Sequence, residues 1–257
     1  MAKQYDFYCA GEWRSSDEPL EVINPYNGET VGVTSYASEQ DFEDATCAAQ
    51  SAFKQMREMP TYKRAEILYQ LSAKLAERRD EVAALMTAEA GKPINDSRVE
   101  VDRGVFTLRV AAEEAQRIHG EQIPLDLMAS SAGRFGVTRR MPIGPIAGIS
   151  PFNFPLNLAL HKIAPAIASG NTIVLKPPSY DPLTMLTFAE LIDEVDLPKG
   201  AVSIMPMNRQ VGDRLVTDDR YKLLSFTGSP DVGWDMKSRA GRKKVVLELG
   251  GNAGVIV

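Results

Sequence analysis

The sequence predicts an α/β fold with a doubly wound parallel sheet preceded by helices. From Ile143 onward, short β-rich runs alternate with stretches of helical composition. This alternation is typical of βαβ units, in which a helix connects two parallel strands. Asp181-Pro182 and Ser229-Pro230 each offer an N-cap followed by proline at the first helical position. The predicted strands are 145–149, 172–176, 202–205, 222–226, 244–249 and 253–257.

The residues before this sheet predict a turn-rich segment, three helices and an extended stretch. The first 37 residues hold turn formers between short apolar runs, which predicts a hairpin-like segment. Ser38 and Asp41 form a capping-box pattern at the start of the first helix. Segment 124–142 has no helical period, so an extended conformation is expected. The predicted helices cover 38–53, 63–90 and 94–119.

Composition describes an ordinary globular chain. Of its 257 residues 44% are hydrophobic and 25% charged, and the net charge of −5 gives no reason to expect nucleic acid. No apolar run approaches the roughly 20 residues that span a membrane, and the first residues lack a signal-peptide pattern. Cys9 and Cys47 form no CxxC motif and no cluster with histidine. We therefore expect a cytoplasmic protein without a membrane partner or a metal site.

Two turns that open helices could contact a ligand. FTGS places Gly228 and Ser229 between a predicted strand and a helix, where free backbone N–H groups suit a dinucleotide pyrophosphate. The motif is not GxGxxG, and Ser229 could simply be an N-cap. PFNFP holds Asn153 in a stiff, apolar setting from which its amide could donate to an oxyanion. A turn asparagine that caps the following helix is an equal alternative.

Two charged residues lie on predicted strands. Lys176 ends the strand TIVLK, where its ammonium could bind ribose hydroxyls or a phosphate, although an exposed lysine would look the same. Glu248 has apolar neighbours and precedes Gly250, so desolvation should raise its pKa toward that of a general base. Strand alternation alone would instead turn Glu248 toward solvent.

The order of these motifs resembles the aldehyde dehydrogenase superfamily. PFNFP, KPPS, FTGS and LELGG follow one another, and EAGKP and Gly200-Ala201-Val202 also match. The resemblance covers essentially the whole chain. It implies that 1–257 is an NAD(P)-binding domain with a Rossmann-like sheet. It also implies an extended arm at about 124–142 that bridges domains and subunits, so we expect a homo-oligomer of the full-length protein.

The resemblance implies roles for the motif residues. Asn153 would polarise the aldehyde carbonyl, Glu248 would act as general base, and Lys176 would bind the adenosine ribose. In the family, a cysteine thiolate attacks the aldehyde, hydride passes to NAD(P)+, and the thioester formed is hydrolysed. The implied cofactor-binding residues are Ser150, Pro151, Phe152, Lys176, Ser179, Gly212, Phe226, Gly228, Ser229, Leu249 and Gly250.

Two positions predict specificity. Many NAD-preferring relatives carry glutamate where this chain has Ser179, so NADP should be tolerated or preferred. His161, with Asn157 one turn earlier, stands where relatives for apolar aldehydes often place a bulky aromatic residue. Arg103 or Arg109 could add a cation, although helix-face arginines and a surface histidine are equally ordinary. A small polar or anionic aldehyde is expected, of the lactaldehyde, glyceraldehyde 3-phosphate, succinate semialdehyde or phosphonoacetaldehyde type.

The family's catalytic cysteine lies a few dozen residues beyond the position of Glu248. Cys9 and Cys47 do not match it, and Cys47 is expected to be a small buried thiol. We therefore expect that the C-terminal catalytic domain is absent and that this chain alone binds cofactor without oxidising aldehydes. A natural, non-catalytic NAD(P)-binding module is the alternative. An alcohol-type dehydrogenase is disfavoured, because GxGxxG, a zinc cluster and a Tyr-x-x-x-Lys pair are missing.

Overall fold

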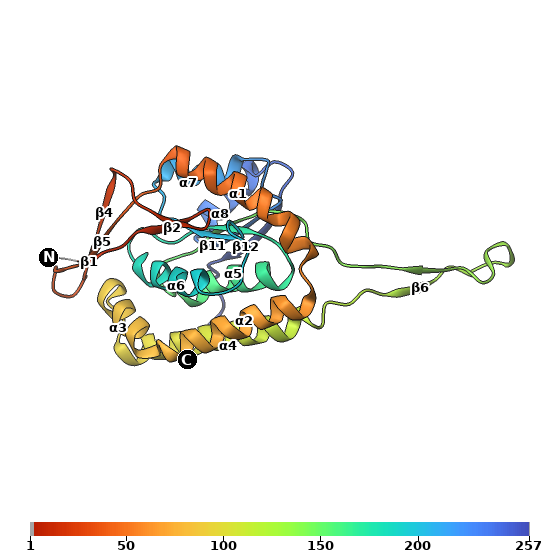
Figure 1. Cartoon of the computed structure of the whole chain (residues 1–257), viewed down its shortest axis with the longest axis horizontal. Coiled ribbons are helices and arrows are strands. Elements are labelled where there is room, and N and C mark those ends of the chain that lie inside the picture. Colours follow the sequence, from red (N-terminus) through yellow and green to blue (C-terminus); the bar gives the residue numbers. More distant parts are fainter. Residues whose placement is uncertain (1–2, 257) are drawn as a thin grey trace.

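A seven-stranded sheet forms the centre of the molecule (Figure 1), which the computed structural model describes from residue 3 to residue 256. Its strand order is β12-β11-β8-β9-β10-β2-β3. Five strands run parallel, namely β8 (Ile146–Ile149), β9 (Ile173–Lys176), β10 (Val202–Ile204), β11 (Leu223–Gly228) and β12 (Lys244–Leu249). The predicted doubly wound sheet is confirmed. Because β8 lies between β9 and β11, the strand order reverses there, which is where such sheets bind ligands.

Helices cover both faces of the sheet (Figure 1). One face carries α1 (Glu39–Glu58), α7 (Arg209–Thr217) and α8 (Pro230–Arg239), and the other carries α5 (Asn157–Ala168) and α6 (Leu183–Asp193). An outer layer packs against α5 and α6 and consists of α2 (Thr61–Glu77), α3 (Arg79–Ala90) and α4 (Ile94–Ala115). Within residues 3–256, no helix is both long enough and apolar enough to cross a membrane.

The predicted helix over 63–90 is wrong in its continuity. The structure divides it into α2 and α3 at Arg78, whose backbone leaves the helical range at φ −97° and ψ 18°. The side chain of Arg78 pairs with Glu81 and with Glu190 on α6, so this break is stabilised by contacts with a distant element. By contrast, the capping box of Ser38 and Asp41 is confirmed at the start of α1.

The N-terminal segment contributes to two sheets. The strands β2 (Phe7–Cys9) and β3 (Glu12–Arg14) form one hairpin and extend the central sheet in antiparallel fashion. Three further strands form a separate small sheet in the order β1-β5-β4 and cover Lys3–Gln4, Thr30–Ser35 and Pro19–Ile23. Because β4 and β5 pair in antiparallel fashion around the turn at 24–29, the turn formers of this segment lie in a hairpin and the hairpin-like prediction is confirmed.

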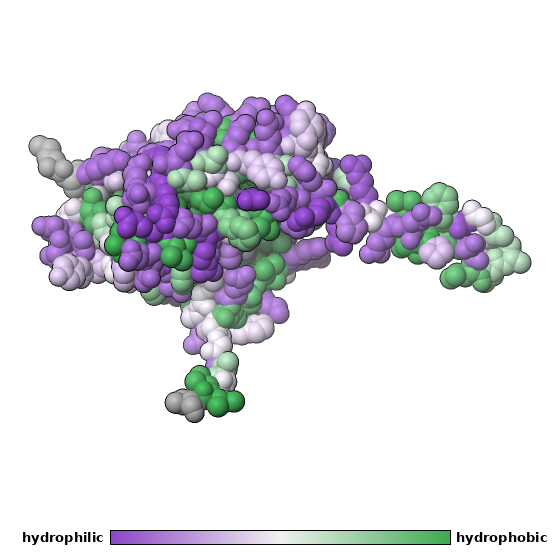
Figure 2. Space-filling model, turned by 90° about the horizontal axis from the view of Figure 1, so that it is seen from below, coloured by the Kyte–Doolittle hydropathy of each residue, from purple (hydrophilic) through white to green (hydrophobic). Residues whose placement is uncertain are grey.

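The segment predicted to be extended projects from the body as a two-stranded arm (Figure 1). Strands β6 (Gln122–Pro124) and β7 (Phe135–Val137) pair in antiparallel fashion, with a 3₁₀ turn at Ala129–Ser131 between them. Apolar residues gather on the arm in Figure 2. Among them, Leu127 is 84% exposed and Val137 is 73% exposed.

Two local predictions fail. Residues 253–256 form no strand, because β12 is the edge of the sheet and offers them no described neighbour to pair with; position 257 lies outside the described residues. Asp181 does not cap α6, which begins at Leu183. Instead, the carboxylate of Glu89 on α3 accepts hydrogen bonds from the backbone N–H groups of Leu183 and Thr184, both at 2.7 Å.

Candidate nucleotide-binding and active site

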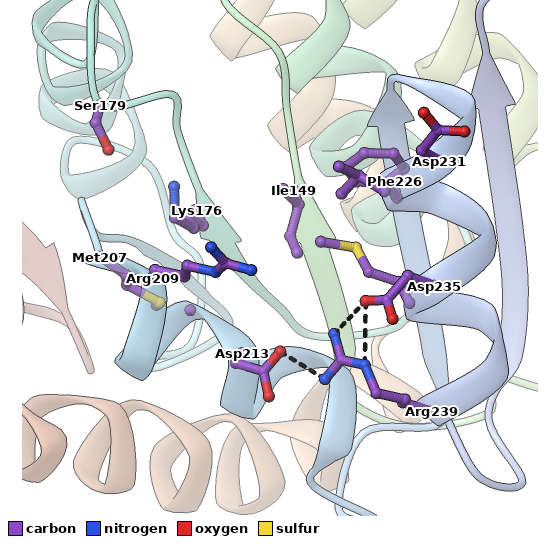
Figure 3. A pocket seen from close by; sticks show the side chains of 13 residues that line it. Ile149, Lys176, Ser179, Met207, Arg209, Asp213, Phe226, Asp231, Asp235 and Arg239 are labelled. Atoms are coloured by element: carbon purple, nitrogen blue, oxygen red, sulfur yellow. Dashed lines mark hydrogen bonds and ion pairs between the residues drawn. The ribbon is translucent and has the colours of Figure 1, made fainter.

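The candidate site is a pocket of about 670 Å³ at the carboxyl ends of β8, β9 and β11 (Figure 3). It lies where the strand order reverses, and α7 and α8 form its other walls. Its lining residues are Ile149, Lys176, Ser179, Met207, Arg209, Gly212, Asp213, Phe226, Asp231, Val232, Asp235, Met236 and Arg239. Four of the predicted cofactor residues are therefore brought together here, namely Lys176, Ser179, Gly212 and Phe226.

Lys176 brings to this pocket a positive charge that no carboxylate of residues 3–256 neutralises. Within the described part of the chain, its Nζ donates only to the carbonyl oxygen of Pro177, at 3.4 Å, and burial lowers its pKa. The stem packs on Gly212, where a Cβ atom would lie 3.1 Å from both Cδ and Cε of the lysine. A partly buried ammonium without a good acceptor favours a ligand that brings oxygen atoms.

The acidic side chains of the pocket are largely neutralised. Arg239 pairs with Asp213 and with Asp235, each at 2.7 Å (Figure 3). Arg209 is the first residue of α7, and its guanidinium extends toward the side of the pocket where Lys176 lies (Figure 3). Arg209 forms no ion pair with any residue between 3 and 256. The wall formed by β9 and the start of α7 is therefore cationic.

The other predicted cofactor residues lie on segments beside the pocket but do not line it. Ser150, Pro151 and Phe152 follow β8; Ser150 is buried with no hydrogen-bond partner for its hydroxyl, and Phe152 packs edge-on against Tyr180 at 6.4 Å. Gly228 and Ser229 join β11 to α8. Leu249 and Gly250 end β12 and follow it. Ser229 occupies the N-cap position of α8, but its side chain makes no capping hydrogen bond.

The two predicted catalytic residues both have exposed side chains. Asn153 is held through its backbone, since its carbonyl oxygen accepts a hydrogen bond from Lys92 Nζ at 2.9 Å. Glu248 lies on β12, where alternate side chains point away from the body. The expected desolvation of Glu248 is therefore wrong for this chain, because β12 is an edge strand with one open face.

Lys162 was not predicted and contacts the same region. It is 4% exposed on α5, and burial lowers its pKa to about 8. Its Nζ donates to Thr227 Oγ1 at 2.7 Å, and that hydroxyl donates to Glu248 Oε2 at 3.3 Å. A lysine within the apolar helix sequence LNLALHKIAPAIA was the signal that could have revealed it.

A second pocket, of about 340 Å³, lies between α4 and α5. Arg103, Asn157 and His161, three of the residues expected to contact a substrate, line this pocket together. Asn157 is buried and its Oδ1 accepts a hydrogen bond from Thr107, whereas burial lowers the pKa of His161. The remaining lining residues are Phe106, Thr107 and Val110.

Arg109 lies outside this second pocket. It pairs with Glu113 one turn along α4, at 3.2 Å, and its side chain is 65% exposed. Six residues separate it from Arg103, which rotates the two side chains by about 120° around a helix of 3.6 residues per turn. Of the two alternative arginines, the geometry therefore selects Arg103.

The model of the aldehyde dehydrogenase family matches residues 13–257, which is nearly the whole chain. The chain belongs to the aldehyde dehydrogenase family. The 3-sulfolactaldehyde dehydrogenase of Priestia aryabhattai is 40% identical over 258 residues, covering 100% of this chain and 54% of that protein. The NADP-dependent glyceraldehyde-3-phosphate dehydrogenase of Streptococcus equinus is 34% identical, again over 100% of this chain and 54% of its own length.

Solved structures of aldehyde dehydrogenases share this fold closely. Aldehyde dehydrogenase 21 of Physcomitrella patens, in complex with the reaction product succinate, superimposes with a TM-score of 0.96 at 46% identity. The match covers 98% of this chain and 53% of that structure. The NADP complex of the NADP-dependent glyceraldehyde-3-phosphate dehydrogenase of Bacillus halodurans gives 0.92 at 31% identity, over 96% and 53%. This aldehyde dehydrogenase chain thus spans about half the length of these relatives.

Neither cysteine of the chain lies at the candidate site. Cys9 is buried on β2, and burial raises its pKa to about 12. Cys47 is exposed on α1, so the expectation of a buried thiol is wrong there; partial desolvation and the neighbouring Glu43 raise its pKa. Both thiols are therefore poor nucleophiles near neutral pH. Residues 3–256 also contain no cluster of three or more His, Cys, Asp or Glu side chains placed to hold a metal ion.

Proposed function

We propose that this chain forms the NAD(P)-binding half of an enzyme that oxidises a small polar or anionic aldehyde to a carboxylic acid. The supporting observation is the cationic wall of the pocket at the strand-order reversal, where the partly buried ammonium of Lys176 has only the distant carbonyl oxygen of Pro177, at 3.4 Å, as an acceptor among residues 3–256. A nucleotide brings ribose hydroxyls and phosphate oxygens of the kind this pocket accommodates. The likeness to NADP complexes of the family supports the same assignment.

In this proposal the chain's own residues bind cofactor and prepare the aldehyde carbonyl. Lys176 binds the adenosine ribose, and the junction of Gly228 and Ser229 directs the N-terminus of α8 at the pyrophosphate. Asn153 donates to the developing oxyanion. Glu248 accepts a proton as general base. Lys162 orients the Glu248 carboxylate through the hydroxyl of Thr227. Bound NAD(P)+ supplies the hydride acceptor, and the route through a thioester requires a cysteine that neither Cys9 nor Cys47 can supply.

The cofactor preference follows from the cationic wall. Ser179 contributes a hydroxyl where a carboxylate would repel a 2′-phosphate, and Arg209 and Lys176 add two cations. Both positive charges would attract a 2′-phosphate on the adenosine ribose. An unphosphorylated ribose is uncharged and would gain less from them. We therefore assign NADP+ as the preferred cofactor, with NAD+ accepted.

The substrate pocket supports a small polar or anionic aldehyde. Arg103 supplies a cation, and His161 and Asn157 supply polar atoms beside it. In the complete enzyme, His161→Phe should lower kcat/KM for succinate semialdehyde at least about tenfold relative to an uncharged aldehyde of similar size. An unchanged ratio between the two substrates would remove His161 from the specificity assignment.

A non-catalytic NAD(P)-binding module is the second candidate. It is favoured by one observation, since the nucleotide pocket is built from residues 149–239 of this chain while neither cysteine approaches it. The two candidates agree on cofactor binding and differ on turnover by the complete protein.

The first test is a fluorescence titration that measures the binding of NADPH to the chain. We expect saturable binding that Lys176→Met weakens at least about tenfold, which corresponds to 1.4 kcal/mol. Lys222→Met changes a lysine at the opposite edge of the sheet and serves as the control. Failure of NADPH and NADH to bind would refute the proposal. The chain alone should show no aldehyde oxidation, and turnover by it after rigorous purification would contradict the assigned need for another cysteine.

A further inference from the structure

A third pocket, of about 870 Å³, lies at the base of the arm and is called the arm-base pocket below. Its walls are the end of α1, the start of α2, the segment that returns from the arm to β8, and the end of α5. Pro142 and Ser169 line it, and these residues precede the parallel strands β8 and β9. This arm-base pocket is therefore at the amino edge of the sheet, opposite the carboxyl edge that forms the nucleotide pocket.

The arm-base pocket is strongly cationic. Five of its lining residues carry positive charge, namely Lys54, Arg57, Arg64, Arg139 and Arg140, against the single carboxylate of Glu58. None of the five forms an ion pair within the described part of the chain. Elsewhere nine arginines do so, namely Arg14, Arg78, Arg79, Arg98, Arg109, Arg117, Arg214, Arg220 and Arg239. Among the arginines of residues 3–256, Arg103, Arg134, Arg209 and Arg242 also lack an ion pair, but only this pocket brings four such arginines together.

Arg64 is fixed in the wall of the pocket without a compensating charge. Its guanidinium packs against Gly170, where a Cβ atom would lie 2.5 Å from Nη1. Nη2 donates to Thr61 Oγ1 at 3.3 Å, and Nε is buried with no acceptor. Burial alone lowers the pKa of Arg64, whereas carboxylate partners raise those of paired arginines such as Arg220. Such an arrangement is costly unless an anion completes it.

The helix ends do not cancel this charge. α2 begins in the pocket with Pro60 at its N-cap and no capping side chain, so its positive end is open. The C-terminal ends of α1 and α5 also meet the pocket and bring roughly half a negative charge each. The helix ends together contribute about half a negative charge, compared with four net positive charges from the side chains.

We propose that the arm-base pocket binds a small multivalent oxyanion of the phosphate or pyrophosphate class. Arginine guanidinium groups match the oxygen geometry of phosphate, and the backbone N–H groups at the start of α2 add donors. The anion would lie between the arm and the body and so fix the direction in which the arm projects. Anion binding in the arm-base pocket does not require a nucleotide at the other edge of the sheet.

The test is isothermal titration of pyrophosphate into the chain, with ³¹P resonance shifts as a second readout. We expect a single site that Arg57→Gln combined with Arg140→Gln weakens at least about tenfold at constant ionic strength. Both residues are exposed, so this variant should fold. Arg64→Gln should weaken binding as strongly, with circular dichroism confirming its fold. Arg242→Gln removes an exposed arginine elsewhere and is the matched control.

The nucleotide pocket is the competing location for pyrophosphate, and a lysine variant separates the two. Lys176→Met should leave pyrophosphate affinity within about twofold. Loss of binding in Lys176→Met, with retention in the Arg57 and Arg140 variant, would overturn the proposal. The proposal would also be overturned if pyrophosphate did not bind at ~1 mM, because its binding free energy would then be weaker than about −4.1 kcal/mol. Binding of an acidic peptide without binding of pyrophosphate would also overturn it, in favour of a protein partner.

Discussion

Arg209 offers the sharpest single-residue test of cofactor preference, because its charge is free and its side chain lies in the nucleotide pocket. Arg209→Gln should weaken NADP+ binding by about tenfold and NAD+ binding by less than about twofold, since a charge-assisted contact to the 2′-phosphate contributes about 1.5–3 kcal/mol. Competition titrations with 2′,5′-ADP and 5′-AMP report this difference directly. Arg242→Gln should change neither affinity. Equal losses for both ligands, or wild-type affinities favouring NAD+ more than about tenfold, would contradict the assignment.

Asp181 makes stability depend on pH. It is 1% exposed, its Oδ1 has no partner, and burial with Glu89 and Glu100 nearby raises its pKa to about 8 from 3.8, with Lys92 opposing. Between these values the folded state keeps a proton that the unfolded state releases, so stability falls as pH rises. Asp181→Asn should therefore gain stability relative to wild type from pH 5 to pH 8, by up to about 1.4 kcal/mol per pH unit.

Urea denaturation at the two pH values measures the effect of Asp181→Asn. Asp126→Asn, at an exposed position of the arm, is the control and should show no such trend. A stability difference between Asp181→Asn and wild type that is the same at pH 5 and pH 8 would rule out this account of Asp181.

At the scale of elements, buried carboxylates join the outer helix layer to the sheet domain. Glu100 on α4 accepts hydrogen bonds from the first backbone N–H groups at the start of α5, those of Leu156 and Asn157, at 3.0 and 3.1 Å. Its other oxygen pairs with Lys92. Glu100→Gln should lower the free energy of unfolding by about 3 kcal/mol, because it leaves the Lys92 ammonium without its buried partner.

Chemical denaturation of two matched variants separates this effect from a general loss of charge on α4. Glu113→Gln removes a partly exposed carboxylate from the same helix and should cost less than about 1 kcal/mol. Lys92→Met combined with Glu100→Gln should be more stable than the sum of the single changes predicts. Equal losses for Glu100→Gln and Glu113→Gln would show that the cap does not hold α4 to α5.

The elements also show what the sequence could and could not predict. Apolar runs located the parallel strands, because buried strands of such a sheet carry little else. Lys176, Ser179 and Phe226 meet because the carboxyl ends of neighbouring strands lie together. The break at Arg78 was missed because a partner on α6 stabilises it. The exposure of Glu248 was missed because local apolarity does not reveal that a strand lies at the edge of a sheet.

At the scale of the whole molecule, the arm presents an exposed apolar surface. Leu127, Met128, Phe135 and Val137 are 84%, 66%, 64% and 73% exposed on it, and burying them would favour association. We predict that the chain self-associates through the arm, as the expected homo-oligomer requires. Leu127→Ser combined with Val137→Thr should weaken self-association about tenfold in sedimentation velocity, or 1.4 kcal/mol. Tyr26→Ser, 93% exposed on the N-terminal segment, should leave it unchanged. If both variants associate like wild type, the contact lies elsewhere, and the apolar arm requires a different partner.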